Sequence, residues 1–275
     1  MNEHPDESPE NSGVSGASGA SGASGAPESS EASGTSEASG TPEASGTPES
    51  SALPPPLPSL PRRCVDVVFS PARLFEALRE RPVWAAALVL GAVVVALQTA
   101  FIPMDVWVEL QREAALQRGT QMPEMGATAL KVLRYAAPAG AVLGWFVMSF
   151  LFAGIVTVIF AFILGDEGRY KQYLSIYAHA MLIPAVVGLL LVPLKIAQRD
   201  PRFTINLGAF FFFLPEGYFH RLLTTMDLTQ IWAWVLVGIG AHAIDTRRSV
   251  ASAVTINVVL AIVVFAIFAI FAPAS

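Results

Sequence analysis

Polar side chains are few inside the long apolar runs of this sequence, where ionisable and amide groups are costly and are candidates for function, and three of them stand out. They are His179, His242 and Asn257. Together they could form a proton or metal site, or each could make a buried hydrogen bond between helices. Two histidines without a carboxylate in the same runs are a poor set of metal ligands. The sequence therefore favours interhelical contacts, and we expect no metal site and no cofactor.

Signatures of known catalytic machinery are missing from the sequence. There is no His-Glu-x-x-His, no Gly-x-Ser-x-Gly, no Walker loop and no Gly-x-Gly-x-x-Gly that opens a helix. The only acids between the second and third apolar runs, Asp166 and Glu167, fall in a predicted loop. The single cysteine, Cys64, excludes an internal disulfide framework and a cysteine-cluster metal site. We therefore predict no catalytic residue and expect that the protein is not an enzyme.

Small residues at four-residue spacing allow helix backbones to approach closely in a membrane. Gly140 with Gly144 forms such a pair, and Ala87 with Gly91 forms another. The spacing predicts helix-packing contacts at these positions. It does not decide between a contact within one chain and a contact between two copies.

The elements that carry these residues are predicted from composition and run length. Of the residues, 53% are hydrophobic and 14% are charged, against about a quarter charged in an ordinary soluble domain. Five uncharged runs are each close to the roughly 20 residues that cross a hydrocarbon core of about 30 Å as a helix. The sequence thus predicts an all-α polytopic membrane protein with five transmembrane helices. They span about residues 84–102, 136–164, 175–194, 228–244 and 250–271.

Two further stretches have the pattern of amphipathic surface helices. Ser70 and Pro71 are typical of a helix start, and Leu74, Phe75 and Leu78 then share one face. Residues 105–118 repeat the pattern and end before Gly119. We expect the first helix to lead into span one and the second to lie on the opposite face of the membrane.

The N-terminal part differs sharply from the rest of the chain. Residues 1–61 hold nine acids and no Lys or Arg, and consist largely of short Ser/Gly/Ala/Pro-rich repeats. Such a composition cannot bury enough apolar surface to offset the entropy of ordering. We predict a disordered acidic tail over 1–61 and a membrane domain over 62–275. Because no part of the chain is strongly basic, nucleic-acid binding is not expected.

The orientation follows from local charge. Arg73, Arg79 and Arg81 crowd the first span, and the two short loops carry Arg169 with Lys171 and Arg247 with Arg248. The C-terminal residues 272–275 have no charge. By the positive-inside rule we expect the N-terminus in the cytoplasm and the C-terminus outside.

Several loop segments resemble the Yip domain family of membrane proteins, which is named for interaction with Ypt/Rab GTPases. The segments are 68–75 with Arg81-Pro82, 168–179 with Ile183-Pro184, 227–240 and 248–251. In the last segment, Val250 replaces a lysine often found in the family. The resemblance covers about residues 65–272 and implies five membrane helices, a cytoplasmic N-terminus and no catalytic residue. Fourteen Arg against three Lys suggest a bacterial member in the inner membrane, so the GTPase partners are not carried over.

Two functions remain open at this point. The first is a non-enzymatic membrane scaffold that recruits partners or organises the bilayer, as the few polar groups in the spans favour. The second is a small-solute transporter or channel, which a polar path through the spans would favour. The expected partners are the lipid bilayer and other membrane or cytoplasmic proteins. The sequence leaves the oligomeric state open.

Overall fold

A computed structural model describes residues 57–122, 125–215 and 217–271 of the chain. Within these ranges the secondary structure is helical apart from one isolated bridge between Asn206 and Asp227. The elements, in chain order, are α1 Leu60–Phe69, α2 Pro71–Glu80, α3 Ala85–Phe101, α4 Met104–Gln117, α5 Ala127–Thr157, η1 Val158–Ile163, α6 Tyr170–Ala180, α7 Leu182–Leu190, α8 Val192–Ala197, η2 Leu207–Phe210, α9 Tyr218–Thr225, α10 Leu228–Ile244 and α11 Val250–Phe271.

The N-terminal described residues form two short helices that precede the first apolar helix. Pro61 and Pro71 each lie in a first helical turn, where the missing N–H costs nothing. The predicted helix after Ser70 is confirmed as α2, which buries Leu74, Phe75 and Leu78. Helix α1 begins at Leu60, before the predicted end of the acidic tail. Residues 1–56 of that tail lie outside the described residues.

The first predicted run is helix α3, and the predicted amphipathic stretch after it is helix α4. The chain bends by 87° between them, at Ile102 and Pro103. Charged residues then fix α4 to the turn after α8. Arg199 pairs with Asp105 and Glu109 at 3.0 and 2.9 Å. The polar face of α4 is therefore held against the segment that follows the third run.

The second and third runs depart from single straight helices. Helix α5 starts earlier than predicted and continues into a π-helical turn, η1, so that the combined helix has 37 residues. The third run is divided into α6, α7 and α8 at Met181 and Leu191. Pro184 and Pro193 lie close after these breaks, in the first turn of α7 and of α8, where a missing N–H costs least.

The fourth and fifth runs are helices with the predicted bounds, α10 and α11. Asp227 begins α10 as an N-cap, because its Oδ1 accepts hydrogen bonds from the backbone N–H groups of Thr229 and Gln230. Between α8 and α10 the chain forms η2, with Phe210–Phe213 exposed, and the short helix α9. The bridge between Asn206 and Asp227 ties this segment to the start of α10.

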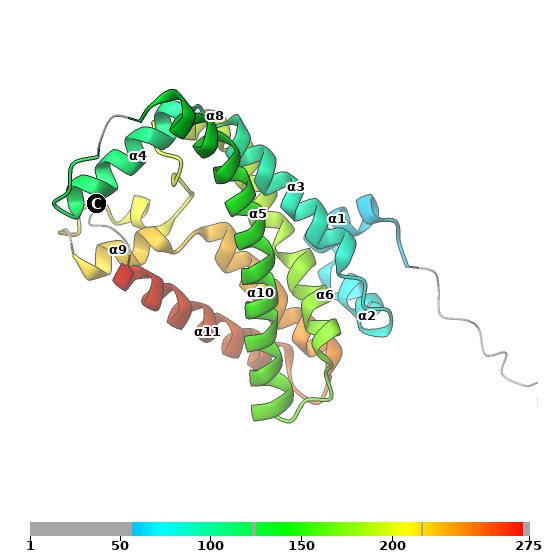
Figure 1. Cartoon of the computed structure of the whole chain (residues 1–275). Coiled ribbons are helices and arrows are strands. Elements are labelled where there is room, and N and C mark those ends of the chain that lie inside the picture. Colours follow the sequence, from blue (N-terminus) through cyan, green and yellow to red (C-terminus); the bar gives the residue numbers. More distant parts are fainter. Residues whose placement is uncertain (1–56, 123–124, 216, 272–275) are drawn as a thin grey trace, which may run out of the picture. The chain divides into compact units, whose positions relative to one another are not determined.

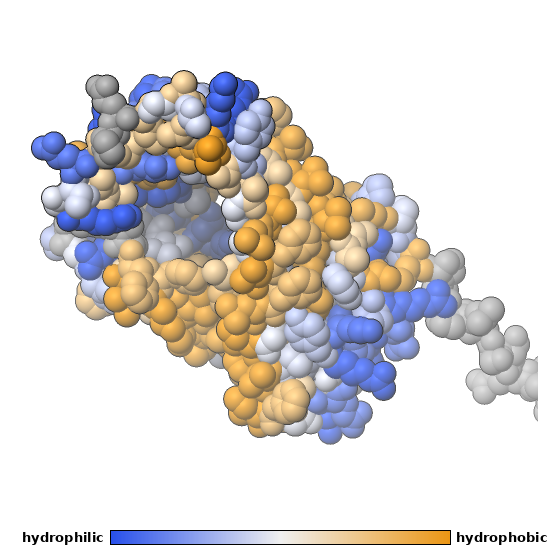
Figure 2. All heavy atoms as spheres, viewed as in Figure 1, coloured by the Kyte–Doolittle hydropathy of each residue, from blue (hydrophilic) through white to orange (hydrophobic). Residues whose placement is uncertain are grey.

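The helices are arranged around α6 and α10, as Figure 1 shows. Helix α10 packs against α11, α2 and α6, while α5 packs against α3 and α6. On α6, every residue from Tyr173 to Ala180 is buried. By contrast, the apolar windows of α5 and α11 are only 28% and 22% buried, and Figure 2 shows apolar side chains over their outer faces. Apolar outer helices around a buried centre are the arrangement expected of a protein in lipid.

The bundle has two ends, which the following sections call the α2 end and the α4 end. The α2 end holds α2 and the loops 164–169 and 245–249, and the α4 end holds α4 and residues 198–227. Helices α3, α6 and α11 run from the α2 end to the α4 end, and α5 and α10 run back.

The length and the apolar composition of each helix show which helices could cross a membrane. Within the described residues three helical segments are long and apolar enough to cross a membrane, namely 127–163, 170–190 and 250–271. The bent pair α3 and α4 would be a fourth, and α10 is an apolar helix of 17 residues. The all-α membrane fold is therefore confirmed, while the count of five spans remains a prediction.

Candidate functional site

His179 joins helix α6 to helix α1. It is fully buried, and its Nδ1 lies 2.7 Å from the carbonyl oxygen of Ser175 one turn earlier. Its Nε2 lies 3.2 Å from Nη1 of Arg63, which is itself buried. A guanidinium can only donate, so Nε2 accepts from Arg63 and the Nδ1–H donates to Ser175. The imidazole is neutral in this arrangement and fixes α1 to the bundle.

His242 and Asn257 have separate partners. Nδ1 of His242 lies 2.6 Å from the carbonyl oxygen of Arg248 in the loop after α10. Nδ2 of Asn257, a fully buried residue on α11, donates to the carbonyl oxygen of Trp234 on α10. The three polar residues singled out in the sequence therefore bond to different elements. Their role as interhelical contacts is taken up below as a proposal.

The loops at the α2 end are joined by ion pairs. Asp166 and Arg248 pair at 2.8 Å, and the guanidinium of Arg248 also donates to the carbonyl oxygen of Leu164. Asp245 accepts hydrogen bonds from the backbone N–H of Glu167 and from the guanidinium of Arg247. Loops 164–169 and 245–249 thus form one unit, which we call the loop clasp.

Asp245 is the most perturbed acid of the loop clasp. The hydrogen bonds from the Arg247 guanidinium hold the pKa of Asp245 well below its usual range, although burial opposes them. The backbone N–H groups of Glu167 and Arg247 contribute in the same direction. The carboxylate is therefore charged at all but strongly acidic pH, and it stabilises the joined loops in that form.

The glycines of the bundle differ in how closely they pack against other elements. A Cβ added to Gly140 or Gly144 would meet no atom within 4 Å, so these residues mark no close contact within the described chain. A contact with a second copy stays a prediction. A Cβ on Gly238 would lie 2.6 Å from Cα of Val254, so α10 and α11 touch through their backbones there. Gly91 of the other predicted pair does pack closely, against the ring of Trp145.

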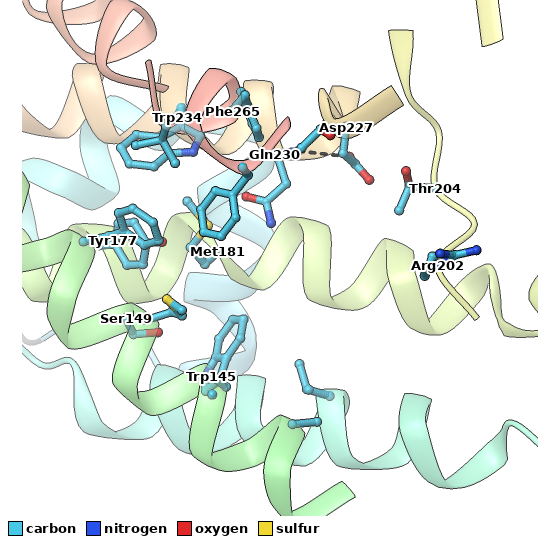
Figure 3. Close-up of a pocket in the computed structure, with 18 of the residues that line it drawn as sticks. Trp145, Ser149, Tyr177, Met181, Arg202, Thr204, Asp227, Gln230, Trp234 and Phe265 are labelled. Carbon is cyan, nitrogen blue, oxygen red and sulfur yellow. Dashed lines mark hydrogen bonds between the residues drawn. The ribbon is translucent and has the colours of Figure 1, made fainter. Parts of the chain in front are cut away.

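A cavity of about 670 Å³ lies between α5, α6, α10 and α11. Figure 3 shows Trp145, Tyr177, Met181, Trp234 and Phe265 around its apolar part, with Arg202, Thr204 and Asp227 at the α4 end. A second cavity of about 250 Å³ adjoins it, since Thr204, Asp227 and Gln230 line both. The two spaces together have one apolar and one polar region.

The polar region contains two basic residues that the sequence analysis did not single out. Lys195 on α8 lines the smaller cavity and is 4% exposed. Arg202 lines the larger one. In the sequence both look like ordinary loop charges after the third run, because only the folded chain turns Lys195 inward. The one available signal was the position of Lys195 directly after an apolar run, where a cation can lie at the membrane interface.

The search for metal ligands covers the described ranges only. In residues 57–122, 125–215 and 217–271, no group of three His, Cys, Asp or Glu side chains is placed so that it could hold a metal ion.

These features define the class of protein: an all-α membrane protein whose apolar helices surround a buried centre and an amphipathic cavity. The chain belongs to the Yip1 domain family, whose model matches residues 65–270. It is also similar to the "Membrane protein YknW" of Bacillus subtilis (strain 168), with 28% identity over 213 residues. That alignment covers 74% of this chain and 87% of the relative. The resemblance to the Yip family and the expectation of a bacterial member are confirmed. No solved structure matches the chain.

Proposed function

We propose that this protein is a non-enzymatic membrane scaffold that presents helices α1 and α2 to partner proteins. The proposal rests on how α1 and α2 pack against the rest of the bundle. Val67, Leu74, Phe75 and Leu78 are buried against the bundle, and Arg63 bonds to His179. The opposite face of α1 leaves Val65, Val68 and Phe69 exposed. A helix that packs against the bundle on one face and exposes apolar side chains on the other is suited to binding a partner.

The buried polar groups support a structural rather than a transporting interior. We propose that His179, His242 and Asn257 serve as contacts between elements. His179 bonds to Arg63 of α1, His242 to the carbonyl oxygen of Arg248 in the following loop, and Asn257 to the carbonyl oxygen of Trp234 on α10. Hydrogen bonds of this kind between membrane helices contribute about 1 kcal/mol each. The three residues bond to separate partners and not to one another, so they form no continuous polar path, although Oδ1 of Asn257 is buried without a hydrogen-bond partner.

The alternative, a small-solute transporter or channel, is favoured by the cavity. However, the cavity ends halfway along the bundle at Phe152, Tyr177 and Trp234, whose ring centroids lie 5.6 to 6.2 Å apart. No residue of loops 164–169 or 245–249 lines it. A space that is closed by three packed rings fits a binding site better than a route across the membrane.

The orientation belongs to the same proposal. We propose five spans in a bacterial inner membrane, with the α2 end in the cytoplasm. The α2 end gathers the basic residues of α2 and of the two short loops. Contacts within it link Gln172 to the carbonyl oxygen of Arg79, and the loop clasp links the loops. Basic residues near span ends favour the cytoplasmic face.

Cysteine labelling tests this orientation. After Cys64→Ser removes the native thiol, Glu76→Cys and Lys171→Cys should label only from the cytoplasm, and Gln111→Cys on α4 only from outside. All three positions are exposed, so folding does not hide them. If positions 111 and 171 label from the same side, the proposed set of spans is wrong.

Photo-crosslinking tests the scaffold. A photoreactive phenylalanine at position 69, where the native ring is 80% exposed, should give discrete protein adducts in native membranes. The same group at the exposed position 111, at the other end of the bundle, is the matched control and should not give those adducts. Adducts to lipid alone at position 69, from a chain that remains folded and abundant, would show that this face contacts the bilayer and would contradict the proposal.

A further inference from the structure

The cavity of about 670 Å³ has a lining that suits a lipid better than a soluble ligand. Its walls are apolar where α5 faces α11, through Trp145, Met148, Val264, Phe265 and Phe268. Only its α4 end is polar. The volume lies within the range of about 300–1,000 Å³ that is typical of ligand sites. One elongated, mostly apolar molecule with a polar end would match this distribution.

The cavity also opens where lipid would be. Figure 2 shows a hollow whose border is apolar along α5 and α11 and hydrophilic along α4. Helices α5 and α11 are the least buried of the apolar helices long enough to span, and they carry exposed apolar side chains such as Leu143 and Val263. A molecule in the surrounding bilayer could therefore enter sideways, without leaving an apolar environment.

The polar end contains a buried cation without a partner. The side chain of Lys195 is turned into the smaller cavity and is 4% exposed. Among the described residues, its ammonium makes no hydrogen bond and no ion pair. Asp200 and Asp227 are the nearest influences on its charge, but Asp200 pairs with Arg202 and Asp227 caps α10. The ammonium therefore has no direct bonding partner among the described residues, and an anionic group in the cavity could bond to it.

Arg202 provides a second cation at the same end. Its side chain is half exposed and lies 3.2 Å from Asp200 and 3.7 Å from Glu113. It lines the larger cavity, and Gln230 and Thr204 lie between the two cavities. Lysine and arginine at one end of an apolar space are suited to binding a phosphate group, and the Asp227 carboxylate, which caps α10, lines the same region.

We infer that the two cavities together bind one phospholipid, with its phosphate at Lys195 and Arg202 and an acyl chain between α5 and α11. A soluble phosphate would satisfy the cations but would leave the apolar walls exposed. A lipid without a phosphate would leave Lys195 unpaired. The inference concerns the bilayer and not a protein partner, so it stands or fails independently of the proposed scaffold.

Native mass spectrometry of the full-length, detergent-purified protein tests the inference, with phosphatidylglycerol as the probe. This lipid carries a phosphate and no amine, so its retention depends on the basic residues. We expect one tightly retained lipid per chain. Lys195→Met should weaken binding at least about tenfold, the effect of losing a charge-assisted hydrogen bond. Lys131→Met, at an exposed position on α5, is the matched control and should bind as the wild type does.

Further probes separate the possible ligands. Diacylglycerol, which lacks the phosphate, and glycerol 3-phosphate, which lacks the chains, should both bind at least about tenfold more weakly than the phospholipid. Gly144→Phe should also reduce lipid binding, because it fills the apolar part without touching a cation. It tests the site even if Lys195→Met fails to fold. Equal phospholipid binding by either folded variant and the wild type, or tight binding of glycerol 3-phosphate, would overturn the inference.

Discussion

Gly238→Ala is expected to lower the free energy of unfolding by about 2 kcal/mol or more. The added methyl group would lie 2.6 Å from Cα of Val254 and 3.1 Å from the carbonyl oxygen of Ala253. Both contacts are with backbone, so no side-chain rotation relieves them, and α10 must move away from α11. For a domain of this size the loss corresponds to a melting temperature lower by about 4–8 °C. Thermal unfolding of the detergent-purified protein measures it.

The matched controls are Gly140→Ala and Gly144→Ala. Both glycines lie inside helix α5, and their added methyl groups would meet no atom within 4 Å. Alanine is favoured over glycine within a helix by about 0.5–1 kcal/mol, so these variants should match the wild type or melt slightly higher. If Gly238→Ala has the same melting temperature as the controls, the backbones of α10 and α11 do not approach as closely as described.

Asp245→Asn should lower the melting temperature by several degrees at neutral pH. The amide cannot replace a charged carboxylate that binds both the Arg247 guanidinium and the backbone N–H of Glu167. The two loops are then joined more weakly, mainly through the pair of Asp166 and Arg248. The matched control is Glu167→Gln, because the Glu167 side chain is 84% exposed and lies 3.8 Å from Arg247. Exposed pairs of this kind contribute little, so the control should melt as the wild type does.

The effect of Asp245→Asn on the melting temperature should be lost at acidic pH and not at basic pH. The pKa of Asp245 is lowered in the folded protein, so its stabilisation is fully present above the unfolded value of about 4. It is lost as pH falls through the lower, folded pKa. The melting temperatures of the wild type and of Asp245→Asn should therefore differ by a constant amount above about pH 5. The difference should disappear only in strong acid. A difference that vanishes near neutral pH would assign the effect to another group.

The helices with charged boundaries were the most predictable part of the fold. Asp227 and Asp245 end an uncharged run on both sides, and α10 has those bounds. The interruptions of the third run were less predictable, because prolines such as Pro184 indicate a bend but not its position. Helix α1 was not predicted. Its stability depends on the distant contact between Arg63 and His179, which are 116 residues apart in the sequence.

The same limit applies to the candidate sites. The spacing of Gly140 and Gly144 is identical to that of a packing pair, but spacing alone does not tell which face of α5 meets a neighbour. Lys195 could not be distinguished from a solvated loop cation, because its burial depends on how α7 and α8 turn after Met181 and Leu191. Polar residues inside apolar runs can be found from sequence. Their partners, and the cavities between helices, require the packed chain.

Helices α3 and α10 each have 17 residues, which gives a length of about 26 Å at 1.5 Å per residue. A typical hydrocarbon core is about 30 Å thick. If both helices cross the bilayer as proposed, the lipid beside them must thin to match, at a cost of fractions of a kcal/mol per Å. This hydrophobic mismatch would favour thin regions of the membrane. The short helices α3 and α10 would then bias the lateral position of the protein, against the longer helices α5 and α11.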